Sequence, residues 1–134
     1  MKQISTFFLI LLAFSPFATS AGSSPETIDG AVTVDTAAAK ALFDDNVPFV
    51  DVRSAKAYGK GHIAKAHNLD VKSFKKNDLA SVAGKDAPVV FYCDGVFCKR
   101  AAGASKKAVG WGWSNVKYYR EGFPGWKGAG HPVE

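Results

Sequence analysis

The chain has 134 residues, 47% of them hydrophobic and 22% charged, and a formal net charge of +5 at pH 7. This is the composition of a folded globular domain, and it excludes a disordered or low-complexity chain. The length fits one domain. The positive charge comes from scattered lysines, which form either a solvated face or an electropositive field that favours small anions.

The first residues resemble an export signal. Lys2 precedes an apolar run over residues 7–14, and small residues follow it. This pattern predicts a secretory signal peptide over residues 1–21, cleaved after Ser20 or Ala21. The apolar run is shorter than the roughly 20 residues that span a bilayer. We therefore expect a periplasmic or secreted protein with no membrane contact after cleavage, and export argues against a nucleic acid partner.

The mature chain is expected to begin with a flexible segment, residues 22–30, ahead of one domain over residues 31–134. A short strand is predicted at 32–34. Asp35 is then placed to cap a helix over residues 35–46, because its carboxylate can accept a hydrogen bond from an amide of the first helical turn.

Short strands and helices alternate from there. The run VPFVDV predicts a strand at 47–52, and a turn with a short helix follows at 54–63. Residues 65–71 form another strand candidate, and residues 72–84 an amphipathic helix. This alternation is typical of an α/β fold with a central parallel sheet.

The strongest strand signal is DAPVVFYC at residues 86–93. It is continuously apolar, as expected for a strand buried on both faces of a parallel sheet. A short loop then leads into a predicted helix over residues 99–109. A last strand is predicted at 115–119, and the glycine- and proline-rich residues 121–134 close the chain.

Cys93 stands at the carboxyl end of that buried strand, where α/β sheets bind ligands. The loop after it leaves backbone N–H groups unpaired, and these groups favour an anion together with the dipole of the next helix. Gly95 permits the positive φ that such a loop needs. With Lys99 and Arg100 nearby, we expect the pKa of the thiol to fall below its usual value of about 8.5. Cys93 is therefore the candidate nucleophile.

The second cysteine, Cys98, leaves three interpretations open. Two cysteines in an exported protein most often form a disulfide. A bridge across four intervening residues restricts little chain entropy, so a reversible redox pair is favoured over a structural bridge. A free carrier thiol at Cys93 is the third interpretation. A zinc site with His62 or His67 is the weakest alternative, because the spacing is not Cys-x-x-Cys, and we expect no metal or cofactor.

The order of motifs over residues 31–134 resembles the rhodanese family. FVDVRSAKAYGKGHIAKAHN is similar to its Asp-Val-Arg and Gly-His-Ile signatures, VVFYCDGVFCKRAA to its active-site strand and loop, and GWGWSNVKYYREGFPGWKGAGHPVE to its closing pattern. The resemblance implies a three-layer α/β fold with a central, mainly parallel sheet flanked by helices. It also implies a monomeric sulfurtransferase that takes sulfur from a small anion such as thiosulfate and passes it to a thiol or protein acceptor, or to cyanide in vitro.

The same resemblance implies roles for single residues. Cys93 would carry the sulfur as a persulfide, and Cys98 would resolve it by forming a disulfide. The substrate-binding loop would comprise Asp94, Gly95, Val96, Phe97, Cys98, Lys99 and Arg100. Asp51, Arg53 and His62 match positions of structural support. Trp126 is expected to pack in the core or at its rim, and the resemblance also implies a place beside the mouth of the site.

The loop also departs from the common family pattern. Six residues lie between Cys93 and Arg100 where four are usual, and Ala101 replaces the usual serine. Asp94 opposes anion binding, so weak activity with thiosulfate is expected. A longer loop also suggests a cysteine phosphatase or arsenate reductase, although the apolar Phe97 argues against that chemistry. A non-catalytic sulfur carrier or interaction module is the other alternative.

Overall fold

The computed structural model describes residues 22–134. The predicted signal peptide, residues 1–21, lies outside the described residues. Within the described part of the chain, no helix is both long and apolar enough to cross a membrane.

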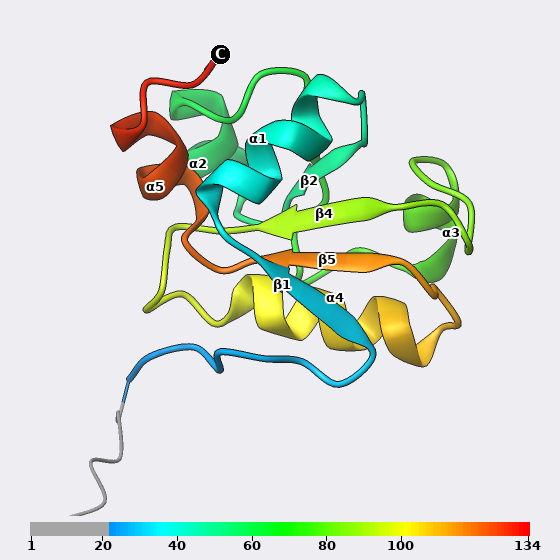
Figure 1. Ribbon diagram of the computed structural model, residues 1–134. Helices are drawn as coiled ribbons and strands as arrows, with labels where there is room; N and C mark the ends of the chain where they lie inside the picture. Colours follow the sequence, from blue (N-terminus) through cyan, green and yellow to red (C-terminus); the bar gives the residue numbers. More distant parts are fainter. Residues whose placement is uncertain (1–21) are drawn as a thin grey trace, which may run out of the picture.

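Strands and helices alternate in the predicted order (Figure 1). The strands are β1 (Ala31–Val34), β2 (Phe49–Asp51), β3 (His67–Asn68), β4 (Val89–Tyr92) and β5 (Val116–Tyr119). The helices are α1 (Thr36–Asp44), α2 (Ala55–Lys60), α3 (Lys76–Ala80), α4 (Arg100–Gly110) and α5 (Gly122–Gly128). The strands pair in the order β1-β5-β4-β2-β3, and every one of these pairings is parallel. The predicted α/β fold with a parallel central sheet is confirmed.

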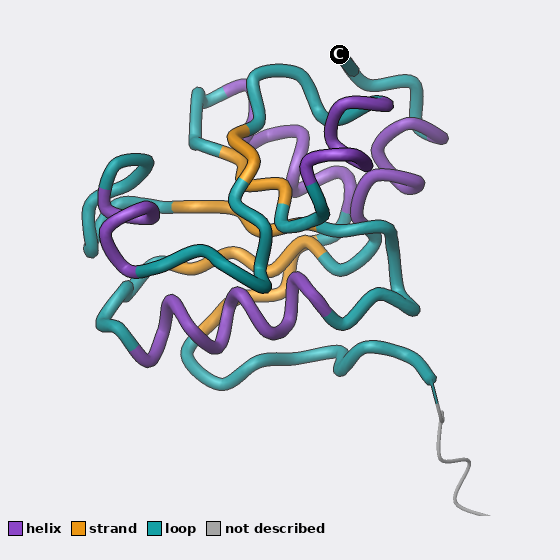
Figure 2. Tube along the Cα trace, turned by 180° about the vertical axis from the view of Figure 1, so that it is seen from behind, coloured by secondary structure: helices purple, strands orange, loops and turns teal. Residues whose placement is uncertain are grey.

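Helices cover both faces of the sheet, with α1, α2 and α5 on one side and α3 and α4 on the other (Figures 1 and 2). Because side chains alternate along a strand, β4 contributes to both cores. Val90 and Tyr92 join the cluster beneath α1 and α5, while Val89 and Phe91 join the cluster beneath α4. All four are fully buried. This central position fixes the end of β4, from which the chain continues into Cys93.

The helix caps and boundaries follow local chemistry. As predicted, the Asp35 carboxylate accepts a hydrogen bond from Ala38 N at 2.8 Å and begins α1. The strand expected at 65–71 shortens to β3. At its expected start, Lys65 has a φ of 66°, which is outside the β region. The helix expected at 72–84 shortens to α3, where the Asp78 carboxylate caps the amide that precedes the first turn.

The closing segment, residues 121–134, contains a helix that its composition does not predict. Trp126 on α5 is fully buried, with its ring centroid 5.1 Å from that of Phe43 and 5.6 Å from that of Phe49. Its indole N–H donates to the Pro132 carbonyl oxygen at 2.7 Å. Burial of this ring outweighs the low helix propensity of the glycines. The expected packing of Trp126 in the core is confirmed, and its alternative place beside the mouth of the site is wrong, because the ring is fully buried.

The first described segment, residues 22–30, packs against the domain. It lies along the side of the molecule that carries α4 (Figure 1). Its expected flexibility stays a prediction. Ile28 is 5% exposed and joins the core beneath α4. The Tyr118 hydroxyl donates to the Pro25 carbonyl oxygen at 2.9 Å, and Thr33 Oγ1 donates to the Glu26 carbonyl oxygen at 2.7 Å. These contacts hold the segment against the domain.

Candidate active site

Cys93 follows β4 directly and is 2% exposed. It belongs to the core cluster beneath α4, as the alternation along β4 requires. Its carbonyl oxygen accepts a hydrogen bond from Phe123 N at 2.8 Å. Gly122 has a φ of 63°, and a Cβ added there would lie 2.2 Å from the same carbonyl oxygen. Only glycine therefore fits at this position beneath the cysteine.

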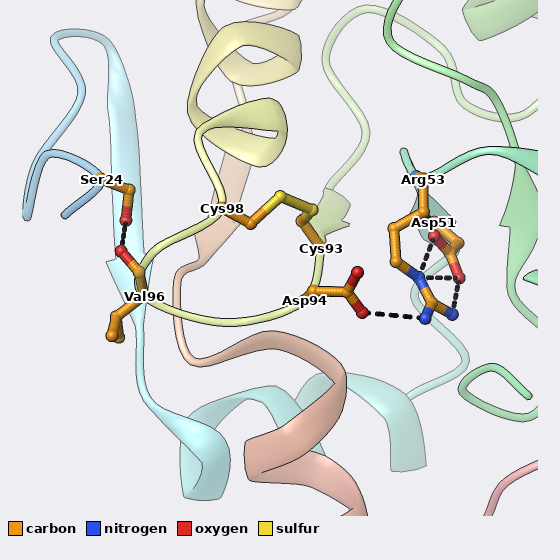
Figure 3. The surroundings of a disulfide bond; sticks show 7 residues. All are labelled: Ser24, Asp51, Arg53, Cys93, Asp94, Val96 and Cys98. Carbon is orange, nitrogen blue, oxygen red and sulfur yellow. Dashed lines mark hydrogen bonds and ion pairs between the residues drawn. A yellow bond between two sulfur atoms is a disulfide. The ribbon is translucent and has the colours of Figure 1, made fainter. Parts of the chain in front are cut away.

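Cys93 is bonded to Cys98 in this structure (Figure 3). Their Cα atoms are 6.2 Å apart, within the usual range for a disulfide. The bridge closes the loop between them, and the structure is therefore that of the oxidised protein. A nucleophilic role for Cys93 would require this bond to be reduced first.

The loop after Cys93 is most exposed at its tip. Phe97 is 78% exposed, whereas Gly95 is buried and has a φ of 107°. Among the described residues, the backbone amides of residues 94–97 have no hydrogen-bond acceptor. Unpaired amides in a tight loop favour a negatively charged ligand.

Lys99 and Arg100 place positive charge at the end of the loop. Lys99 is exposed, and Arg100 is half-buried as the first residue of α4. The predicted loop residues are thus contiguous around the disulfide.

A buried ion pair lies beside the start of the loop. Arg53 donates from Nη2 to Asp51 Oδ2 at 2.7 Å, and from Nε to both carboxylate oxygens at 3.0 and 3.1 Å. Asp51 is fully buried and Arg53 is 4% exposed. The Tyr92 hydroxyl donates to Asp51 Oδ2 at 2.9 Å, and Asn68 Nδ2 donates to the carbonyl oxygens of both Asp51 and Arg53. The carboxylate is therefore fully partnered.

The surroundings of Arg53 and Tyr92 raise the pKa of both side chains. Burial by itself lowers the pKa of Arg53, but hydrogen bonds and attraction from Asp51 and Asp94 outweigh burial and raise it. Burial, followed by the charge of Asp51, raises the pKa of Tyr92 well above its usual value. Arg53 therefore stays charged and Tyr92 stays neutral at physiological pH.

Arg53 connects this network to the loop. Its Nη1 donates to Asp94 Oδ1 at 3.0 Å (Figure 3). Its guanidinium lies 4.8 Å from the ring centroid of Phe123. The negative charge of Asp94, which was expected to oppose anions, is thus partly neutralised. Its side chain is nevertheless 58% exposed, so solvent weakens the pair.

His62 contacts Tyr58 and the C-terminal residue, Glu134. Its ring stacks on Tyr58 at a centroid distance of 3.6 Å, and its Nδ1 lies 2.8 Å from the Tyr58 carbonyl oxygen. Its Nε2 lies 3.4 Å from a carboxylate oxygen of Glu134. None of these contacts reaches the loop. In residues 22–134, no three His, Cys, Asp or Glu side chains are grouped so as to hold a metal ion.

Sequence reasoning missed four residues that shape the site: Ser24, Tyr92, Arg120 and Gly122. Only Tyr92 had a signal, because a tyrosine in an otherwise apolar buried strand needs a partner for its hydroxyl. Ser24 N donates to the Val96 carbonyl oxygen at 2.7 Å. Ser24 Oγ donates to the same oxygen, also at 2.7 Å (Figure 3). Nothing in the local sequence around Ser24 indicates this contact.

Two curated relatives share part of their length with this chain. The HTH-type transcriptional regulator Rv0324 of Mycobacterium tuberculosis is 36% identical over 88 residues, which are 66% of this chain and 38% of the regulator. The uncharacterized protein YibN of Escherichia coli is 32% identical over 98 residues, which are 72% of this chain and 66% of YibN. The chain therefore spans less than two thirds of either relative.

Solved structures share the fold. The BH2092 protein of Bacillus halodurans has a TM-score of 0.69 at 26% identity, covering 77% of this chain and 76% of its own. The human single-domain sulfurtransferase TSTD1 has a TM-score of 0.62 at 20% identity, covering 72% and 95%. The fold is thus one that a sulfurtransferase uses. A family model, the rhodanese-like domain, matches residues 28–129. Because the match covers most of the chain, the chain belongs to the rhodanese-like domain family.

Proposed function

We propose that this protein is a sulfurtransferase that carries sulfane sulfur as a persulfide on Cys93 and resolves it with Cys98. One observation carries the proposal. Cys93 directly follows the central strand β4 and is bonded to Cys98, in a loop whose amides at 94–97 have no acceptor among the described residues. Membership of the rhodanese-like family supports the same chemistry.

The proposed steps need the two thiols of Cys93 and Cys98, a sulfur donor and a sulfur acceptor. The thiolate of reduced Cys93 attacks the outer sulfur of thiosulfate, a new S–S bond forms, and sulfite leaves with the electron pair of the broken bond. The outer sulfur then passes to a thiol, or to cyanide as thiocyanate, and the Cys93 thiolate returns. In the resolving branch, the Cys98 thiolate attacks Cys93 Sγ, hydrogen sulfide leaves, and the disulfide forms.

A redox dithiol protein is the second candidate, and the bonded sulfurs favour it. Such a protein would exchange electrons with a partner dithiol and carry no sulfur. Attack by a thiolate on a disulfide depends on access to the sulfur. Because Cys93 is 2% exposed and Cys98 is half-buried, a partner thiol would bond to Cys98 first.

We also propose that the protein acts outside the cytoplasm as a monomer, with a small sulfur-containing anion and a thiol or protein acceptor as partners. The signal-peptide pattern at residues 1–21 supports export. N-terminal sequencing of the protein from an expressing cell should begin at residue 21 or 22. A chain that keeps Met1 in the cytoplasm would contradict export.

Intact mass tests the sulfur-carrier proposal. The reduced mature protein, Cys93→Ser and Cys98→Ser are each incubated with thiosulfate, weighed, and then treated with cyanide. We expect a gain of one sulfur atom that requires Cys93, is discharged as thiocyanate, and persists longer in Cys98→Ser. No sulfur adduct in any form, with a two-proton loss on mild oxidation, would favour the redox dithiol instead.

A further inference from the structure

The N-terminal segment contacts the loop at the Val96 carbonyl oxygen. Ser24 is 2% exposed, and its backbone N–H and hydroxyl both donate to the Val96 carbonyl oxygen. Figure 3 shows this carbonyl on the outer side of the loop, away from the sulfurs of Cys93 and Cys98. Two donors 72 residues away in sequence therefore hold the Val96 oxygen outward.

Arg120, which follows β5, fixes the direction of the Ser24 hydroxyl. Arg120 Nε donates to Ser24 Oγ at 3.1 Å, and Nη2 donates to the Ser24 carbonyl oxygen at 2.9 Å. Because Oγ accepts from the guanidinium, its own proton is directed at the Val96 oxygen. The positive charge polarises the hydroxyl and strengthens this second hydrogen bond.

The outward carbonyl determines where the next amide points. No peptide bond in residues 22–134 is cis. In a trans peptide the C=O and the following N–H point in opposite directions. Since Ser24 holds the Val96 carbonyl outward, the Phe97 N–H is turned to the inside of the loop. Within the described chain, this N–H has no acceptor.

We infer that Ser24 is a positioning residue for the sulfur chemistry of Cys93, because it directs the Phe97 N–H at a negatively charged sulfur held inside the loop. The inference rests on the proposed function and names a residue that acts through the loop backbone. Ser24 lies outside residues 28–129, which match the family model. Arg120 supports the same arrangement through Ser24.

The thiol pKa of Cys93 tests this role without any sulfur donor. It is measured from the pH dependence of alkylation in a Cys98→Ser background, which keeps the thiol free. Ser24→Ala retains the backbone donor and loses the hydroxyl, so we expect the pKa to rise by about half a unit. Arg120→Met should raise it in the same direction, and Ser24→Thr should restore it.

Thr33→Ala is the matched control, because the Thr33 hydroxyl also holds the N-terminal segment but binds Glu26 and not the loop. We expect it to leave the Cys93 thiol pKa unchanged. The persulfide formed with thiosulfate should decay about threefold faster in Ser24→Ala than in Thr33→Ala.

Two failures are distinguishable. An unchanged thiol pKa in both Ser24→Ala and Arg120→Met would overturn the positioning role, whatever their melting temperatures. A parent protein that takes up no sulfur would overturn the proposed function, while the pKa comparison would still decide whether Ser24 stabilises a negative charge at Cys93.

Discussion

The loop between Cys93 and Arg100 is held differently on its two sides. On one side, the buried pair Asp51 and Arg53 reaches Asp94 through a charged hydrogen bond. On the other, Ser24 holds Val96 with two donors, while the tip at Phe97 is 78% exposed. Removing one partner of a buried ion pair is costly, whereas a single neutral hydrogen bond contributes about 1 kcal/mol. The first side therefore contributes more to the stability of the fold. The second side can change with little loss of stability, and it carries the proposed effect on the Cys93 thiol.

Breaking the buried side should have the largest effect. Arg53→Met leaves the Asp51 carboxylate buried without its cation, so we expect the free energy of unfolding to fall by about 3–5 kcal/mol. Urea denaturation measures this loss. Lys40→Met is the control, since Lys40 pairs with Asp44 on the exposed surface of α1 and contributes about 1 kcal/mol or less. Equal losses in the two variants would show that burial of Arg53 does not matter.

Tyr92→Phe removes a hydroxyl that donates to Asp51 and accepts from Ile63 N at 3.0 Å. We expect the free energy of unfolding, measured by urea denaturation, to fall by about 1–3 kcal/mol, because the buried carboxylate and amide each lose a partner.

Tyr92 also determines how stability depends on pH. Its folded pKa is raised, so above pH 10 the unfolded state releases the phenol proton while the folded state keeps it. Stability from this group is complete below about pH 10 and is lost as pH rises further. Burial raises the pKa of Tyr119 to about 12, which adds to the same slope. Urea titrations from pH 8 to 11 should therefore show a weaker pH dependence in Tyr92→Phe, and an unchanged slope would contradict this account.

Asp94→Asn removes the loop carboxylate that pairs with Arg53. The residue is 58% exposed, so the loss of its ion pair with Arg53 should cost less than about 1 kcal/mol of stability. Removing the carboxylate beside Cys93 should raise kcat/KM for thiosulfate by up to about tenfold, equivalent to about 1.4 kcal/mol of repulsion. The gain should shrink at high ionic strength. Asp86→Asn, a surface control, should change neither quantity, and an unaltered rate in Asp94→Asn would remove the charge argument.

Phe97→Ser should have the smallest effect on the fold. Because the ring is 78% exposed, we expect a change in unfolding free energy of no more than about 0.5 kcal/mol. Urea denaturation beside Arg53→Met gives the sharpest contrast between the two sides. A loss above 1 kcal/mol would mean that the loop tip is packed against the domain in solution.

The elements with local signals were predictable. Asp35 begins α1 as its side chain requires, and the apolar run of β4 is followed by Cys93 at its carboxyl end. Both follow from neighbouring residues, through capping and hydrophobic pattern. The family motifs identified the fold for the same reason, because they record residues close together in sequence.

The contacts that hold the loop were not predictable. Arg53 and Asp94 are 41 residues apart in sequence, and Ser24 and Arg120 are 96 apart. Which polar side chains meet across such distances depends on how the strands are ordered in the sheet, and composition does not encode this order. Helix α5 was missed because the burial of Trp126 overrides the local preference of its glycines.

The geometry at Gly122 affects how mutagenesis data on this protein are interpreted. Any side chain at this position would meet the Cys93 carbonyl oxygen at 2.2 Å, and the backbone would be strained at a φ of 63°. A saturation mutagenesis screen that scores the proposed sulfur transfer would therefore find Gly122 as intolerant as Cys93, the proposed nucleophile. An investigator ranking positions by lost activity would assign chemistry to a residue that has no functional group. Intolerance to mutation at this site measures the space beneath the cysteine.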